Sequence, residues 1–130
     1  MMIQNSDTLI SIIIPIYNEE KTILQVLKNV SEIKKLNYSH EVIVVDDGST
    51  DNSKKIIEEN NTLYDLLLFN KANEGKGAAV KKGIEASKGK YIIFQDADLE
   101  YDPNDFIKFF KVIEKFNPDL IIGSRFNYSN

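Results

Sequence analysis

The sequence predicts an α/β fold with a mostly parallel sheet and helices on both of its faces. Short apolar, β-branched segments alternate with segments of helical periodicity along the 130 residues. This alternation favours parallel strands joined by right-handed helical crossovers. No internal repeat, low-complexity tract or linker interrupts the pattern. We therefore expect a single domain over residues 1–130.

The expected elements follow from the spacing of apolar residues. The first strand, 9–16, is rich in isoleucine, and the helix after it, 19–36, has one apolar face and Asn18 as its expected N-cap. The remaining strands are expected over 41–45, 63–69, 91–95 and 120–122, and the remaining helices over 53–59, 75–87 and 105–116. Ligands of such open sheets bind beyond the carboxyl ends of the strands.

Composition narrows the class of protein. The net charge is −4, which argues against a broad nucleic-acid-binding surface. Cysteine is absent, so disulfides and zinc–thiolate sites are excluded. The longest apolar run, 9–16, is too short to span a bilayer, and the N-terminus lacks the features of a signal peptide. We expect a cytoplasmic protein, and peripheral contact with the cytoplasmic face of a membrane stays open.

Three acidic residues, Asp96, Asp98 and Glu100, alternate where an apolar segment ends. Side chains two apart in an extended chain share a face, so these carboxylates can point to one place. Crowded carboxylates repel one another unless a cation lies between them. The simplest interpretation is Mg²⁺ or Mn²⁺ held by these carboxylates and by the phosphates of a ligand. The alternative is a solvated loop that caps the following helix.

Acidic and aromatic side chains also follow the first two predicted strands. Asp46 and Asp47 end the second strand, and we expect one of the two to accept a hydrogen bond from a nucleobase or a ribose. Pro15, Tyr17 and Glu19 follow the first strand. Tyr17 offers a flat face for a base, and Glu19 offers another acceptor. Strand termination and helix capping are the alternative explanation for both segments.

Two further segments carry positive charge. Gly75 and Lys76 open the third predicted helix, where small residues let a ligand approach and the helix N-terminus attracts anions. The segment matches neither a Walker A loop nor a dinucleotide fingerprint, so a flexible helix start is the alternative. Arg125 follows the fifth strand and is the only arginine among 16 basic residues. Its planar guanidinium suits a phosphate, although an ordinary surface residue is the alternative.

These segments together resemble the family 2 glycosyltransferases of GT-A fold. The resemblance is strongest to the branch of dolichol-phosphate mannosyltransferases and polyprenol-phosphate glucosyltransferases, and it covers about residues 10–125. The motifs that carry it are SIIIPIYNE at 11–19, VVDDGS at 44–49, NEGKG at 73–77, DADLE at 96–100 and GSR at 123–125. Each motif is weak alone, but five in family order are specific.

The resemblance implies inverting transfer of a hexose from a GDP- or UDP-hexose. By position, the nucleoside pocket corresponds to Pro15, Tyr17, Glu19, Asp46 and Asp47. Asp96 and Asp98 correspond to the family's DxD motif, which binds Mg²⁺ or Mn²⁺ on the donor diphosphate. Glu100 stands where close relatives have a glutamine in the metal shell. Arg125 corresponds to an arginine that contacts donor or acceptor phosphate, so Asp98 and Arg125 are the expected catalytic residues.

The resemblance also implies what lies beyond the donor site. The expected acceptor is a polyprenyl or dolichyl phosphate at the membrane surface, which is already an anion and needs no general base. Relatives continue through a second, acceptor-binding half, so we expect a domain truncated relative to the full family domain. The alternative function is a non-catalytic nucleotide-sugar-binding module, or half of a split enzyme acting with a partner chain. An exposed sheet edge would favour self-association as a homo-oligomer.

Overall fold

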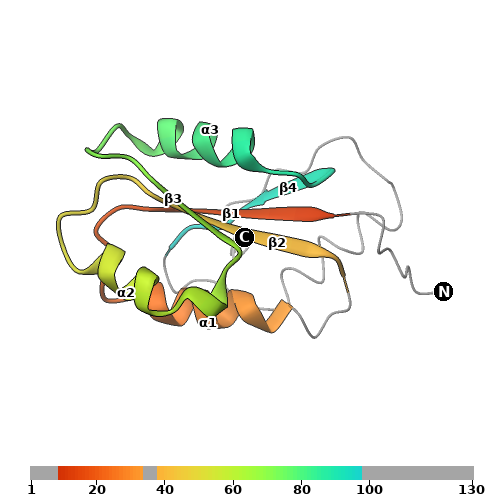
Figure 1. Ribbon diagram of the computed structural model, residues 1–130, viewed down its shortest axis with the longest axis horizontal. Helices are drawn as coiled ribbons and strands as arrows, with labels where there is room; N and C mark the ends of the chain where they lie inside the picture. Colours follow the sequence, from red (N-terminus) through yellow and green to blue (C-terminus); the bar gives the residue numbers. More distant parts are fainter. Residues whose placement is uncertain (1–8, 34–37, 98–130) are drawn as a thin grey trace, which may run out of the picture.

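The computed structural model describes residues 9–33 and 38–97, and these residues contain a parallel sheet of 4 strands in the order β3-β2-β1-β4 (Figure 1). The strands are β1 (Ile10–Ile16), β2 (His40–Asp46), β3 (Leu66–Phe69) and β4 (Tyr91–Phe94). Parallel pairing requires a crossover between successive strands, and the helices provide it. The predicted parallel sheet is confirmed.

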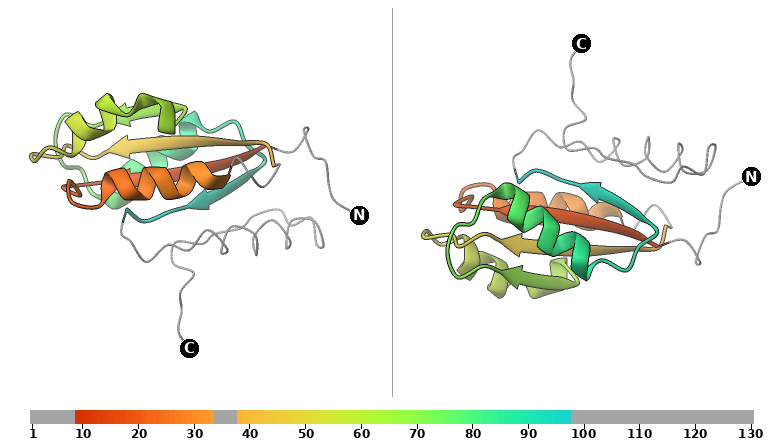
Figure 2. Two further views of the ribbon diagram at one scale, coloured as in Figure 1. Left: turned by 90° about the horizontal axis from the view of Figure 1, so that it is seen from below. Right: turned by 90° about the horizontal axis from the view of Figure 1, so that it is seen from above.

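Helices cover both faces of this sheet. Helices α1 (Ile23–Ser31) and α2 (Ser53–Glu59) lie on one face, and α3 (Lys76–Ala86) lies on the other, as Figure 1 shows. Figure 2 shows α3 crossing above β1 and β2, the two strands that it contacts most. A 3₁₀ turn, η2 (Asn61–Leu63), joins α2 to β3. The predicted layering is therefore confirmed.

Side-chain alternation in β1 divides the core between the two faces. Ile10, Ile12, Ile14 and Ile16 are buried in the cluster beneath α1 and α2. Ile13 points to the opposite face and belongs to the smaller cluster beneath α3. There Gly83 allows close approach, because a Cβ at this position would lie 2.6 Å from Ile13 Cγ2. This packing fixes the start of α3 over the carboxyl edge of the sheet.

Three sequence-based boundaries change in the structure. Helix α1 begins at Ile23 rather than at residue 19, and Asn18 is not its N-cap, because Asn18 has a positive φ of 52° and bonds to another loop. Strand β1 begins at Ile10 rather than at residue 9, and it ends at Ile16 as predicted. Strand β3 begins at Leu66 rather than at residue 63, because Leu63 belongs to η2 and Tyr64 and Asp65 connect η2 to the strand.

Two further sequence predictions concern the rest of the chain. The helix expected over 105–116 and the strand expected over 120–122 lie outside the described residues. Within residues 9–33 and 38–97, no helix has the length and apolar character needed to cross a bilayer.

Candidate functional site

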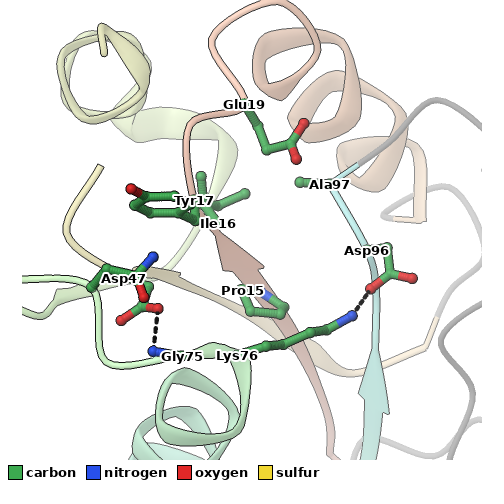
Figure 3. A pocket seen from close by; sticks show the side chains of 10 residues that line it. Pro15, Ile16, Tyr17, Glu19, Asp47, Gly75, Lys76, Asp96 and Ala97 are labelled. Carbon is green, nitrogen blue, oxygen red and sulfur yellow. Dashed lines mark hydrogen bonds and ion pairs between the residues drawn. The ribbon is translucent and has the colours of Figure 1, made fainter. Parts of the chain in front are cut away.

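The segments that follow all four strands meet at the carboxyl edge of the sheet and enclose a cavity of about 400 Å³ (Figure 3). This is the edge at which open parallel sheets bind their ligands. The lining residues are Pro15, Ile16, Tyr17, Glu19, Asp47, Asn73, Gly75, Lys76, Asp96 and Ala97. The structure therefore brings together every described residue of the predicted site except Asp46.

The cavity has two chemically different ends. Tyr17 and Asp47 lie at one end, and Asp96 lies at the other, with Lys76 extending between them past Pro15 (Figure 3). Tyr17 is 42% exposed, so its ring is available to a ligand. An aromatic face with a nearby acceptor suits a nucleobase, whereas carboxylate and ammonium groups suit a cation and phosphates. The spacing of these groups fits an elongated, partly anionic ligand.

The two adjacent aspartates have different surroundings. Asp46 is the last residue of β2 and shares its face with Val42 and Val44, beneath α1 and α2. It is 1% exposed, and its Oδ2 accepts a hydrogen bond from the Ser49 N–H at 3.2 Å. Asp46 was predicted together with Asp47 as a residue of the nucleoside pocket, but it does not line the cavity. Alternation along β2 is the physical reason.

Asp47 anchors the segment that leads into α3. Its Oδ1 accepts hydrogen bonds from Asn70 Nδ2 at 2.8 Å and from the Glu74 N–H at 2.9 Å, and its Oδ2 accepts one from the Gly75 N–H at 2.9 Å. Burial raises the pKa of this carboxyl, but the bonds from Glu74, Asn70 and Gly75 outweigh burial and hold the pKa below its ordinary value. Asp47 is thus an ionised acceptor that also shapes the cavity wall.

Asn18 joins the loop after β1 to the loop after β2. Its Oδ1 accepts hydrogen bonds from the Thr50 N–H at 2.8 Å and from the Asp51 N–H at 3.3 Å. Its own N–H donates to Ser49 Oγ at 2.9 Å. The left-handed backbone of Asn18 is one that asparagine tolerates better than most residues. These bonds fix Tyr17 and Glu19, the neighbours of Asn18, relative to the segment that begins with Asp47.

Thr22 joins the loop after β1 to the segment after β4. Its hydroxyl lies 2.8 Å from the carbonyl oxygen of Ala97 and 3.2 Å from Glu19 Oε2. All four loops that form the cavity are therefore joined by side-chain hydrogen bonds, since Asp47 likewise joins the loop after β2 to the segment after β3. The sequence did not point to Thr22, because a threonine in the first turn of a predicted helix gives no functional signal.

Lys76 and Asp96 form an ion pair across the cavity (Figure 3). Lys76 is the first residue of α3, and Asp96 lies two residues beyond the end of β4. The side chain of Asp96 is 13% exposed, whereas that of Lys76 is 61% exposed. The shielded carboxylate is therefore the fixed partner, and the lysine is the partner that can move.

The Asp96 end of the cavity offers carboxylate oxygen, the type of ligand atom that Mg²⁺ and Mn²⁺ prefer. Asp96 supplies one carboxylate on the cavity wall, and magnesium sites commonly use one or two carboxylates with ligand phosphates and water. The described ranges 9–33 and 38–97 contain no group of three or more His, Cys, Asp or Glu that could hold a metal ion. The other predicted ligands, Asp98 and Glu100, lie outside the described residues, as does Arg125.

Two asparagines shape the site, and the sequence pointed to one of them. Asn73 lines the cavity and belongs to the NEGKG motif at 73–77, whereas Asn70, which is 6% exposed and bonds to Asp47, was not predicted. Asn70 directly follows β3, so a polar residue after an apolar strand was a usable signal. His40 lies at the opposite edge of the sheet, where it pairs with Ile10 at the amino ends of β2 and β1.

A parallel sheet covered by helices on both faces, with a polar cavity at its carboxyl edge, defines an open α/β domain of the class that binds ligands at this edge. The chain belongs to glycosyl transferase family 2, whose model matches residues 11–130. The fold is accordingly GT-A, and the resemblance inferred from the five motifs is confirmed at the level of the family.

Relatives and a solved structure agree with this assignment. An uncharacterized protein of Methanocaldococcus jannaschii is 41% identical over 120 residues, which are 87% of this chain and 50% of that protein. The dolichyl-phosphate beta-glucosyltransferase of Dictyostelium discoideum is 37% identical over 129 residues, covering 89% of this chain and 39% of that protein. Among solved structures, the mannosyltransferase PcManGT from Pyrobaculum calidifontis, in complex with GDP-Man and Mn²⁺, matches with a TM-score of 0.69 and 26% identity over 82% of this chain and 32% of that one. The chain thus spans half or less of the length of these proteins.

Proposed function

We propose that this chain binds the nucleotide-sugar donor of a metal-dependent hexosyl transfer, with a GDP- or UDP-hexose as donor and a polyprenyl or dolichyl phosphate as acceptor. The observation that supports this most directly is the convergence of Tyr17, Asp47, Lys76 and Asp96 on one cavity. The family and the dolichyl-phosphate relative support the reaction class. The complex of the solved neighbour with GDP-Man and Mn²⁺ supports the class of donor and of cation.

The nucleoside half of the donor binds at the Tyr17 end in this proposal. The Tyr17 ring stacks on the base, and base stacking on an aromatic side chain stabilises a complex by about 1–3 kcal/mol. Asp47 remains ionised and accepts a hydrogen bond from the base, while Glu19 and Pro15 form the facing wall. Rigid loops held by Asn18 and Thr22 keep these groups in place before the donor arrives.

The diphosphate binds at the Lys76 end. The N–H groups at the start of α3 and the Lys76 ammonium provide positive potential there, next to Gly75, which has no side chain to obstruct the approach. Asp96, with Asp98 and Glu100, would hold Mg²⁺ or Mn²⁺. When bound, this cation stabilises the negative charge that develops on the departing diphosphate. Arg125 contributes a second positive group, so Asp98 and Arg125 are the proposed catalytic residues.

Chemistry at the acceptor needs little from the protein. A polyprenyl phosphate is already an anion at neutral pH, so its oxygen can attack the anomeric carbon without a general base. Attack from the face opposite the leaving diphosphate inverts the anomeric configuration. The proposed site residues therefore have to position the donor and to stabilise its leaving group.

Calorimetry with GDP- and UDP-hexoses, each with and without Mn²⁺, tests donor binding. We expect one of the two donors to bind, and to bind more tightly with Mn²⁺. Asp98→Asn should remove the effect of Mn²⁺ and leave the thermal unfolding curve unchanged. A transfer assay with polyprenyl phosphate then separates an active enzyme from a binding module. Failure of both donors to bind under all conditions would contradict the proposed function.

A further inference from the structure

The Lys76–Asp96 ion pair occupies the position where the proposed function needs a cation and a diphosphate. It joins the first residue of α3 to the segment after β4, across the width of the cavity (Figure 3). Asp96 is the sole member of the proposed cation site within the described residues, and Lys76 belongs to the proposed diphosphate site. In the structure, therefore, the two sites are linked to each other rather than prepared for separate ligands.

The backbone around Lys76 is fixed, but its side chain is not. Asp47 holds the N–H groups of Glu74 and Gly75 at 2.9 Å, and Ala79 N donates to the Gly75 carbonyl at 3.1 Å in the first turn of α3. Beyond this anchored backbone, Lys76 has a four-carbon stem with rotatable bonds and a side chain that is 61% exposed. The ammonium group can therefore change partner while the helix start stays in place.

Electrostatic repulsion determines when the Lys76 ammonium group leaves Asp96 for another partner. An ammonium group and a divalent cation repel each other when both approach the same carboxylate. Binding of a cation at Asp96 thus favours the departure of Lys76. The donor diphosphate, which arrives at the same end of the cavity, offers the ammonium a new anionic partner at the start of α3. The Lys76 ammonium then stabilises the negative charge of the departing diphosphate, and it no longer neutralises the Asp96 carboxylate.

We infer that Lys76 is an exchangeable counter-ion, which neutralises Asp96 before the cation binds and transfers to the donor diphosphate afterwards. The inference rests on the proposed function and deepens it. It assigns Lys76 two effects of opposite sign. The lysine weakens the binding of a cation in the absence of nucleotide, and it strengthens the binding of a nucleoside diphosphate in the presence of the cation.

Lys76→Met tests both effects, because it removes the charge and keeps a long apolar stem. Without nucleotide, we expect Lys76→Met to bind Mn²⁺ about two- to fivefold more tightly than the wild type, as befits the loss of one partly exposed ion pair. With saturating Mn²⁺, we expect it to bind GDP or UDP about tenfold more weakly. Titration calorimetry and the EPR signal of free Mn²⁺ measure these affinities.

Two companion variants keep the test decisive. Lys76→Arg retains the charge and should bind Mn²⁺ as weakly as the wild type. Lys81→Met removes a charge from the exposed side of the same helix, away from the cavity, and should change neither affinity. Thermal unfolding of each variant establishes that it is folded.

The outcomes separate this inference from the proposed function. Equal or weaker Mn²⁺ binding by Lys76→Met overturns the counter-ion exchange, even if donors bind as proposed. Undetectable Mn²⁺ binding by both proteins at millimolar concentration also overturns it. If GDP, UDP, the GDP-hexose and the UDP-hexose all fail to bind the wild type, the proposed function is overturned. The comparison of Mn²⁺ affinities still tests whether Lys76 competes with the cation for Asp96.

Discussion

Asp47 Oδ2 accepts a hydrogen bond from the Gly75 N–H at 2.9 Å, across 28 residues of sequence. This bond ties the end of β2 to the residue before α3. Gly75 has a φ of 101°, a backbone conformation that glycine adopts readily and other residues rarely adopt. One carboxylate thus lines the nucleoside end of the cavity and also sets the direction in which α3 starts.

Asp47→Asn should destabilise the fold in a pH-dependent manner. The variant loses charge-assisted bonds to Glu74 and Gly75, which stabilise by about 1.5–3 kcal/mol. Because the folded-state pKa of Asp47 lies below the unfolded value, this stabilisation is complete above the unfolded pKa of about 3.9 and is lost as pH falls through the folded value. Urea unfolding at pH 7 and near pH 3 measures it.

The difference in unfolding free energy between wild type and Asp47→Asn should therefore shrink at low pH. Asp51 also has a lowered pKa, since hydrogen bonds from Ser53 and Glu20 outweigh the effect of burial, but both proteins contain Asp51 and its contribution cancels. A difference that is as large at pH 3 as at pH 7 would show that Asp47 does not stabilise the fold as an anion.

Much of the fold could be predicted because it depends on local patterns. The isoleucines of β1 and the valines of β2 alternate between two helix-covered faces, as their spacing indicates. The carboxyl ends of parallel strands share one edge, so the sequence alone suffices to place the motifs after β1, β2 and β4 together. Helix α1 begins later than predicted because the backbone N–H groups of Asn18 and Glu20 donate hydrogen bonds to side chains of the loop after β2.

The pairing of individual side chains could not be predicted. Apolar periodicity does not reveal that Asp46 faces α1 and α2 whereas Asp47 lines the cavity, because both are acidic and adjacent. The contact between Lys76 and Asp96, 20 residues apart, depends on how α3 lies over the sheet. Thr22 was missed for the same reason, since its partner Ala97 is 75 residues away.

Asn18→Ala should weaken both the fold and the nucleoside site. Alanine loses the bonds to Thr50 and Asp51 and adopts the positive φ at a cost of about 1–2 kcal/mol. We expect a total destabilisation of about 2–3 kcal/mol and weaker nucleotide binding, because Tyr17 and Glu19 lose their support. Denaturant unfolding and calorimetry measure the two effects.

Two matched variants separate the contributions of Asn18. Asn18→Gly relieves the backbone cost but still lacks the side-chain bonds, so it should recover part of the stability. Asn18→Asp retains an acceptor for the Thr50 and Asp51 N–H groups and should recover more. Full recovery in the glycine variant would mean that the hydrogen bonds to the second loop are unimportant.

Gly48→Ala should be strongly destabilising, whereas Gly77→Ala should not. A Cβ at Gly48 would lie 2.6 Å from the Asn73 backbone nitrogen, and its φ of 74° is unfavourable for alanine. We expect a loss of about 2 kcal/mol or more. A Cβ at Gly77 meets nothing within 4 Å, and alanine in a helix stabilises by about 0.5–1 kcal/mol. Similar melting temperatures for the two variants would contradict the close packing of the 70–75 segment on Gly48.

Tyr17→Ala should reduce nucleotide affinity without destabilising the fold. The ring is 42% exposed and lines the cavity, so its removal costs little packing but removes a stacking surface. We expect affinity for the bound nucleotide to fall about tenfold or more, and Tyr17→Phe to retain most of it. If Tyr17→Phe loses as much affinity as Tyr17→Ala, the hydroxyl rather than the ring makes the important contact.

The most direct test of the account is the dependence of donor affinity on Mn²⁺ in the wild type and in Asp96→Asn. Calorimetry gives the ratio of the dissociation constants of the GDP- or UDP-hexose with EDTA and with Mn²⁺. We predict a ratio well above one for the wild type and close to one for Asp96→Asn, with unchanged thermal unfolding. An equally large ratio in Asp96→Asn would show that this carboxylate does not join a cation to the donor.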